Sequence, residues 1–179
     1  MRASLPSRLL RACRIGVAAS AAVAAPVLAG PSGLDAFVAR HHCEVLAGLT
    51  ILYETAHPRD RYLILSWPPA DPGYVQCLFE DDNSAVLCEA ASGFYLKNGW
   101  RVSANGKAAL AGLGFSTDGS KGNFAQTLKL DAPPNLEKIT RLMLNALYQG
   151  YRGWPERKID WTAPWAPFAT AALRCAPTA

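Results

Sequence analysis

Residues 74–90 read YVQCLFEDDNSAVLCEA, and the expected fold is built outward from this stretch. Two apolar runs, residues 74–79 and 85–90, flank a polar turn made by residues 81–84. Apolar runs separated by a short polar turn are typical of a β-hairpin. A turn centred on Asp82 and Asn83 places Cys77 directly opposite Cys88 on the neighbouring strand.

The length of the turn decides how closely these two cysteines approach. A two-residue loop makes them a hydrogen-bonded pair with Cα atoms about 5.5 Å apart, whereas a four-residue loop makes them the closer, non-hydrogen-bonded pair at about 4.5 Å. A disulfide is feasible in both cases, because disulfides join Cα atoms about 4.4–6.8 Å apart. Side chains alternate between the two faces of a strand, so both cysteines belong to the more apolar face, which we expect to point to the core. That face carries Val75, Cys77, Phe79, Val86, Cys88 and Ala90.

The N-terminal segment 1–29 has the parts of a cleaved secretory signal peptide. Its only charges are arginines at positions 2, 8, 11 and 14; an alanine-rich apolar run follows, and small residues at positions 27 and 29 precede a cleavage site before Gly30. The run is short for a bilayer-spanning helix, which needs roughly 20 residues. We expect a periplasmic or secreted protein without stable membrane insertion after cleavage. An uncleaved membrane anchor and an Arg-rich mitochondrial presequence are the alternatives.

Export changes the interpretation of the charge and of the cysteines. The chain has a formal net charge of +4, but four arginines belong to the segment 1–29, so the mature part is close to neutral and has no basic stripe of the kind that binds nucleic acid. Cys13 is removed with the signal. The four remaining cysteines favour two disulfides over four buried free thiols, because an even number is typical of an oxidising compartment. If Cys77 pairs with Cys88, the second bridge joins Cys43 to Cys175.

The rest of the chain alternates helical and extended patterns. Residues 33–53 have an apolar stripe that predicts a helix, with Cys43 on its small-residue back. We expect strands at 62–67 and 124–130, a short helix at 103–112 capped by Ser103, and a long helix capped by Asn135. The aromatic and Pro-rich tail 154–179 is expected to pack on the domain formed by residues 30–153. The fold class is α+β: a small twisted antiparallel sheet, a meander plus a further strand, flanked by an N-terminal and a C-terminal long helix.

Few residues carry the chemistry of catalysis. His41 and His42 are ligand types, but neighbours on a helix point in different directions and no second ligand pair at zinc spacing follows, so structural histidines are favoured. No nucleophile elbow, phosphate-binding glycine loop or zinc-protease helix motif occurs. We therefore expect no catalytic residue, no cofactor and no metal.

A binding surface is expected in two places. Gln76 and Glu89 lie on the outer face of the predicted hairpin, and Trp161 and Trp165 belong to the tail. An exposed apolar patch usually marks a surface for a partner. For the tail, the favoured interpretation is that its tryptophans complete the domain's own core.

Four short motifs followed by a long helix resemble the TY-Chap/YbjN-like domains, which are bacterial relatives of type III secretion chaperones. The motifs are Tyr74-Val75-Gln76, Cys88-Glu89-Ala90-Ala91-Ser92, Leu113-Gly114-Phe115 and Gly122-Asn123-Phe124. The resemblance runs from about Leu34 to Gly153 and extends through residues 161–164. It implies a small twisted antiparallel sheet with flanking helices and a non-enzymatic role in binding a partner polypeptide, often as a homodimer. Since type III secretion chaperones work in the cytoplasm, the export signal limits the implied role to general protein binding.

The expected function is that of an exported, non-enzymatic protein-binding or chaperone-like module. One alternative is a small periplasmic hydrolase or metal-dependent enzyme that uses Glu89, His41 or His42. A purely structural protein of the cell envelope is another.

Overall fold

A five-stranded antiparallel sheet organises the part of the chain that the structure describes. The computed structural model describes residues 32–55, 60–69, 71–80, 82–119, 122–164 and 167–175, all within one compact unit. The predicted targeting segment 1–29 lies outside these described residues, as do His57 and Trp165.

The strands follow the order β4-β3-β2-β1-β5 across the sheet, and each neighbouring pair is antiparallel. Their bounds are Tyr62–Ser66 for β1, Tyr74–Phe79 for β2, Ala85–Ala90 for β3, Phe124–Lys129 for β4 and Asp160–Thr162 for β5. Strands β1 to β3 form a meander and β4 is the further strand, which confirms the predicted α+β fold. The fifth strand comes from the predicted tail; it is three residues long, too short for an alternating pattern to be recognised in the sequence.

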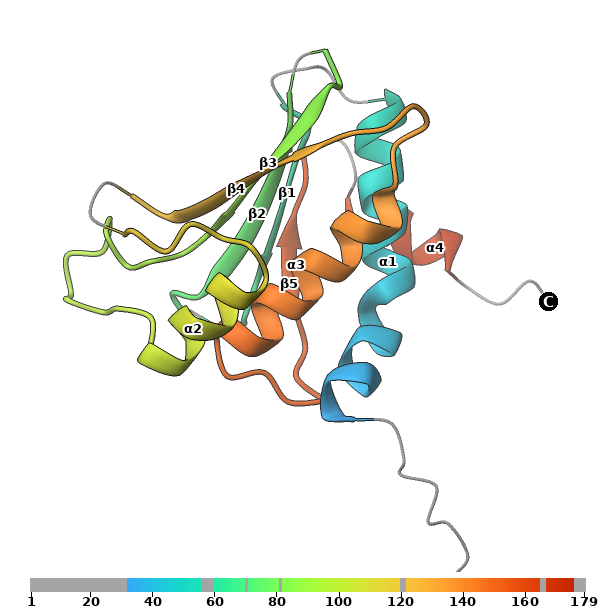
Figure 1. Ribbon diagram of the computed structural model, residues 1–179. Coiled ribbons are helices and arrows are strands. Elements are labelled where there is room, and N and C mark those ends of the chain that lie inside the picture. Colours follow the sequence, from blue (N-terminus) through green and yellow to red (C-terminus); the bar gives the residue numbers. More distant parts are fainter. Residues whose placement is uncertain are drawn as a thin grey trace, which may run out of the picture. The chain divides into compact units, whose positions relative to one another are not determined.

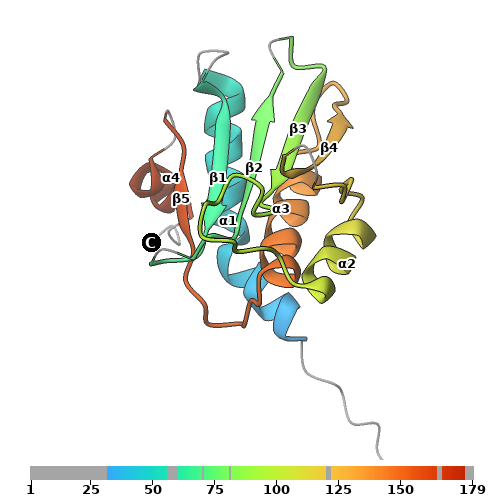
Figure 2. The same cartoon turned by 90° about the vertical axis from the view of Figure 1, so that its left-hand side faces the viewer.

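Two long helices, α1 (Gly33–Thr55) and α3 (Leu136–Gly150), pack together on one face of the sheet (Figure 1). The view in Figure 2 shows the strands in front of these helices. The shorter helix α2 (Ala104–Gly112) contacts α3, and α4 (Phe168–Arg174) contacts α1. None of the helices within the described ranges is long and apolar enough to cross a membrane.

Both predicted helix caps are present. The Ser103 hydroxyl accepts a hydrogen bond from the Gly106 amide at 3.1 Å, and the Asn135 side chain accepts one from the Lys138 amide at 3.0 Å. These bonds satisfy backbone N–H groups that have no partner inside the helix. They fix the starts of α2 and α3, whose packing against each other shapes one end of the domain.

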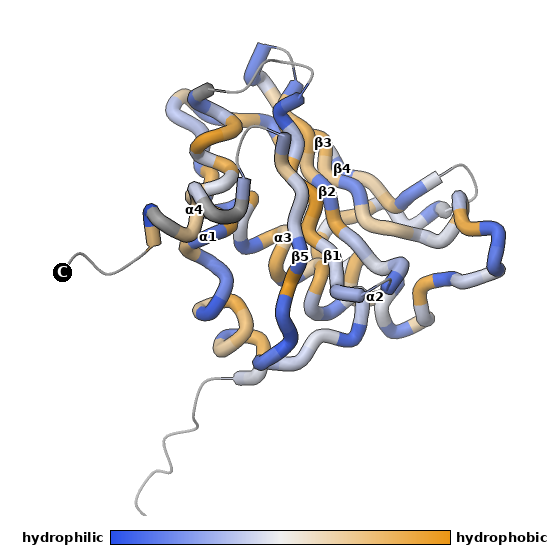
Figure 3. The backbone as a smooth tube through the Cα atoms, turned by 180° about the vertical axis from the view of Figure 1, so that it is seen from behind, coloured by the Kyte–Doolittle hydropathy of each residue, from blue (hydrophilic) through white to orange (hydrophobic). Residues whose placement is uncertain are grey.

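The register of the hairpin confirms the prediction. Cys77 lies opposite Cys88, and the apolar face that carries both is buried against the helices. The Glu80 amide donates to the Ala85 carbonyl at 2.9 Å, which leaves residues 81–84 as a four-residue loop. The cysteines therefore form the closer type of pair; their Cα atoms are 4.1 Å apart and a disulfide joins them. In Figure 3, hydrophobic residues run along the central strands and polar residues gather at the hairpin turn.

A second disulfide attaches the C-terminal segment to α1. It joins Cys43 to Cys175, with Cα atoms 5.8 Å apart. Cys43 is exposed, whereas Cys77 and Cys88 are buried. Helix α4 also contacts α1, so C-terminal residues lie against this helix, and Ala47 of α1 is buried.

The guanidinium group of Arg157 holds the same segment to the sheet from the other end. It lies between the rings of Trp67 and Trp154, at 4.2 and 4.6 Å from their centroids, and pairs with Asp71 at 2.8 Å. Cation–π contacts and a partly buried ion pair stabilise this arrangement. The described residues of the tail, 154–164 and 167–175, are consequently attached to the rest of the folded unit at both ends.

Candidate functional site

The face of the sheet opposite α1 and α3, here called the outer face, carries side chains that are partly or fully exposed. It includes Tyr62, Ile64, Tyr74, Gln76, Leu78, Leu87, Glu89, Ala125, Thr127 and Lys129. Leu78 has 37% of its surface exposed, an unusual value for a leucine in the central strand of a sheet. The outer face is thus a mixed apolar and polar surface, with its strand backbones paired on both sides except at the edges.

Gln76 and Glu89, predicted to bind a partner, lie opposite each other on β2 and β3 of the outer face. The Gln76 amide donates a hydrogen bond to the Glu89 carboxylate. This bond accounts for a charged residue within an otherwise apolar strand, because a partly buried carboxylate needs a donor. The pair offers the remaining carboxylate lone pairs to a partner on this face.

The β4 strand presents an open backbone edge. Ala125 exchanges two backbone hydrogen bonds with Ser116, and Leu130 donates to Ser84 on the β3 side at 2.9 Å. Because amides alternate in direction along a strand, the N–H and C=O groups of Thr127 and Lys129 point the same way as those of Ala125, away from β3. Among the described residues no backbone group pairs with Thr127 or Lys129 on this side.

A small pocket of about 150 Å³ lies beside this open edge, between β4 and the start of α3. Its apolar wall is made by Leu128, Leu130 and Ile139, and Lys129 and Lys138 lie at it as well. We call the open backbone groups and this pocket together the β4 edge site. A side chain carried by an added strand on this edge, facing the helices, reaches the pocket because inward side chains recur at every second residue.

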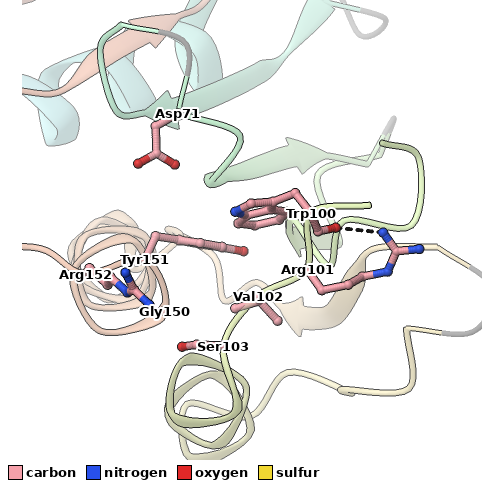
Figure 4. A pocket seen from close by; sticks show the side chains of 8 residues that line it. All are labelled: Asp71, Trp100, Arg101, Val102, Ser103, Gly150, Tyr151 and Arg152. Atoms are coloured by element: carbon pink, nitrogen blue, oxygen red, sulfur yellow. Dashed lines mark hydrogen bonds between the residues drawn. The ribbon is translucent and has the colours of Figure 1, made fainter. Parts of the chain in front are cut away.

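A second pocket, of about 190 Å³, lies where β2 begins and α3 ends (Figure 4). The ring of Trp100 stacks on that of Tyr151, with centroids 6.3 Å apart, and Asp71 faces them from the loop before β2. Burial raises the pKa of Tyr151, and its hydroxyl donates to the Ala91 carbonyl at 2.8 Å. Asp71 is occupied by Arg157 and by the Gly73 amide. The polar groups of this pocket therefore hold the structure together and are not poised for acid–base chemistry.

The histidines have separate structural partners. Nε2 of the buried His41 donates to the Arg157 carbonyl at 3.1 Å, while Nε2 of His42 lies 2.7 Å from the Glu137 carboxylate. Burial lowers the pKa of His41, the Arg157 carbonyl opposes this effect, and the charge of Arg40 adds to it. No group of three or more His, Cys, Asp or Glu side chains that could hold a metal occurs within the described ranges.

Trp161 lies on the inner face, away from Gln76 and Glu89. It is opposite Leu65 in the pairing of β1 with β5, and its ring packs over Gly48 of α1, where an added Cβ would come within 2.8 Å of the ring. The ring is half-buried and contributes to the core. Trp165, the other tail residue predicted to bind, is outside the described residues.

The β4 edge site was missed by sequence reasoning. Its backbone groups carry no residue signature, and its pocket forms only when β4 and α3 are brought together. The signal that was available is the alternation of residues 124–130, which predicts a strand but does not say that the strand lies at an edge.

Comparison with known proteins gives one family. The model for the family described as T3SS (YopN, CesT) and YbjN peptide-binding chaperone 3, TY-Chap3, matches residues 43–155. No curated protein and no solved structure matches the chain. The matched segment covers more than half of the sequence and contains β1 to β4 together with α2 and α3. The chain therefore belongs to the TY-Chap3 family of peptide-binding chaperones.

Proposed function

We propose that this chain is an exported, non-enzymatic chaperone-like module that binds an extended segment of a partner polypeptide on the β4 edge site. The open backbone groups of Thr127 and Lys129 carry this proposal, because an unpaired strand edge is a template for an added strand. The family description as peptide-binding supports a polypeptide as the ligand.

The pocket beside β4 defines the segment that the site would favour. Backbone hydrogen bonds supply affinity that is independent of sequence, and pockets for alternate side chains supply specificity. An aliphatic side chain fits the wall of Leu128, Leu130 and Ile139. Asp131 also lines the pocket and offsets one of the two lysines, so Lys129 and Lys138 leave one net positive charge that favours an acidic residue beside it. The expected ligand is an extended peptide with an aliphatic residue beside an acidic one.

Export is supported by the two disulfides, which are typical of proteins in oxidising compartments, and by the signal-like segment 1–29. We place the protein in the periplasm or outside the cell. The hydrolase and metal-enzyme alternatives lose support from the geometry, because Glu89, His41 and His42 point to three different partners.

The test uses the purified, oxidised chain and a library of random extended peptides, with affinities of selected peptides measured by calorimetry. Thr127→Pro removes the outward N–H of β4 without touching the bonds to β3, since proline is tolerated on an edge strand where its nitrogen faces solvent. Thr127→Ala keeps the N–H and is the matched control. We expect Thr127→Pro and Leu128→Ser each to weaken binding by about tenfold or more, an effect of about 1.4 kcal/mol.

Two outcomes contradict the proposal. Equal affinity of Thr127→Pro and Thr127→Ala for the selected peptides would show that the β4 edge is not the site. The second outcome is that a second copy of the chain occupies the β4 edge. Light scattering would then find a wild-type dimer at micromolar concentration and a monomer for the Thr127→Pro variant. In that case the ligand of the β4 edge would be a second copy of the chain and not a peptide.

A further inference from the structure

Residues 91–117, which form the loop after β3, helix α2 and the turn after it, are called here the aromatic–basic lobe. The mature chain holds all 14 acidic residues of the sequence, yet none lies in this lobe. Its charged side chains are Lys97, Arg101 and Lys107, and all three residues are exposed. The lobe therefore carries a formal charge of +3 and the rest of the mature chain one of −3. Asp118, directly after the lobe, lines a pocket with Arg101 and Lys107 and offsets part of the lobe's charge.

Two adjacent aromatic residues of the lobe are exposed to solvent. Phe94 is 44% exposed and Tyr95 is 68% exposed, and their rings meet edge to face with centroids 5.0 Å apart. Only Leu78 and Trp154 are comparably exposed large hydrophobic residues among those described, and Trp154 is occupied by the guanidinium of Arg157. Exposed apolar patches of this kind mark surfaces that meet a partner.

The backbone of the lobe holds these rings outward. Gly93 has a φ of +91°, and a Cβ there would lie 2.2 Å from the Trp100 carbonyl, so the turn requires glycine. The Ser92 hydroxyl donates to the Gly122 carbonyl at 2.6 Å and accepts from the Phe94 amide at 3.1 Å. The Arg101 guanidinium donates to the Gly93 carbonyl at 2.9 Å. Phe94 and Tyr95 are thus exposed on a turn that its own hydrogen bonds fix.

We propose that the aromatic–basic lobe is a peripheral membrane-docking surface for anionic phospholipid. Aromatic rings with an apolar body and a polar tip favour the depth of lipid headgroups, and Lys and Arg beside them are attracted to anionic lipids. In Figure 1 the loop before α2 lies on the side of the strands away from α1, whereas α2 itself packs on α3, so docking through this loop leaves α1 in solution. In this proposal the lobe adsorbs to the surface of the bilayer.

Lipid is favoured over another polyanion by the placement of the rings. In nucleic-acid recognition, aromatic side chains stack on bases along a basic groove that tracks the backbone. Here the two rings pack edge to face against each other at a turn and form no stacking platform for bases, and Arg101 and Lys107 line a pocket together with Asp118. An acidic peptide is an alternative outcome of the test below.

The experiment measures co-sedimentation of the purified, oxidised chain with vesicles of phosphatidylglycerol and phosphatidylcholine in equal parts, compared with vesicles of phosphatidylcholine alone. We expect binding to the anionic vesicles that is about tenfold stronger or more and that weakens with added salt. The aromatic variant is Phe94→Ser with Tyr95→Ser, and the charge variant is Lys97→Glu with Lys107→Glu. Each is expected to lose binding by about tenfold or more.

The matched control is Lys158→Glu with Arg174→Glu, which makes the same change in net charge at exposed basic residues outside both the lobe and the β4 edge site. It should keep binding within about twofold of the wild type. A Phe94→Trp with Tyr95→Trp variant should keep binding, because tryptophan suits the interface as well; this separates loss of the rings from damage to the turn.

Several results would overturn the proposal. The first is that the chain binds anionic and zwitterionic vesicles equally well. The second is that the control variant loses as much binding as the charge variant of the lobe, since the attraction would then depend only on net charge. Binding of polyglutamate that is as sensitive to the lobe variants as vesicle binding would instead identify an acidic polypeptide as the ligand.

Discussion

The contact between α2 and α3 gives the sharpest prediction of stability, because the same substitution should have opposite signs at two positions of one helix. Gly106 is buried, and an added Cβ would lie 2.2 Å from the Gly150 carbonyl oxygen and 3.1 Å from its carbonyl carbon. Both atoms belong to the backbone, so no rotamer change can make room. The two helices must move apart by about 1 Å, and the atom pairs between them that separate lose about a quarter to a half of their dispersion energy.

Overpacking of this kind costs about 1–3 kcal/mol, occasionally more. Alanine in place of glycine gains up to about 1 kcal/mol of helix propensity, which offsets only part of the cost where backbone collides with backbone. We expect Gly106→Ala to lower the free energy of unfolding by about 1–2 kcal/mol on balance. Gly112→Ala, at the last residue of the same helix, meets nothing within 4 Å and should raise it by about 0.4–1 kcal/mol.

Urea unfolding followed by circular dichroism measures both variants, and thermal unfolding should show a shift of about 2–4 °C per kcal/mol for a chain of this size. The slope of the urea transition should not change. If Gly106→Ala is as stable as Gly112→Ala, α2 and α3 do not approach as closely as described. The pocket of about 190 Å³ that Ser103 and Gly150 line would then have a different shape.

Four further predictions concern the two disulfides, Arg157 and His41. Peptide mapping of the non-reduced protein should find Cys43 joined to Cys175 and Cys77 to Cys88, and a mild thiol reductant should open the exposed first bridge before the buried second one; any cross-pairing would contradict the structure. Cys43→Ser with Cys175→Ser should destabilise the fold by up to about 5 kcal/mol, because the bridge closes a loop with a sequence separation of 132. Arg157→Ala should lower the free energy of unfolding in urea by about 2–3 kcal/mol, because Asp71, Trp67 and Trp154 lose the guanidinium that they contact. Arg157→Lys should restore only part of this stability. Full restoration by lysine would refute the stacking of the guanidinium on the two rings. Burial lowers the pKa of His41 below its unfolded value of 6.5, so below about pH 6.5 the unfolded state binds more protons than the folded state, and the free energy of unfolding should fall as the pH drops. His41→Gln should make the free energy of unfolding less dependent on pH between 7.5 and 5.5. If the variant shows the same pH dependence as the wild type, other groups cause it.

Much of the fold could be predicted because it is encoded locally. The hairpin follows from a polar turn between two apolar runs, and its register follows from the position of the turn, so the pairing of Cys77 with Cys88 needed no tertiary information. The caps at Ser103 and Asn135 are equally local, since each side chain bonds to an amide three residues away. Helix α3 extends from its cap over the predicted apolar stripe.

What could not be predicted depends on contacts between distant parts of the chain. Strand β5 has three residues and is a strand only because β1 offers an unpaired edge. The sequence left Trp161 as a residue either of a binding surface or of the core; pairing opposite Leu65 directs it to the inner face, onto the backbone at Gly48. Arg157 carries no motif; its role arises from two tryptophans and an aspartate that lie far from it in the sequence. Strand alternation says which residues share a face, but not which strand is last in the sheet.

The position of β5 bears directly on where a peptide can bind. The family match ends at residue 155, so the shared part of the fold contains a sheet that ends at β1 on one side and at β4 on the other. In this chain the residues beyond the match place β5 on Ile64, Leu65 and Ser66, and the Cys43–Cys175 bridge and Arg157 hold that segment in place. An added strand would have to displace β5 to reach that part of β1, whereas Thr127 and Lys129 of β4 are open. The C-terminal segment thus makes the two edges unequal, and this inequality is the physical reason for placing the peptide on β4.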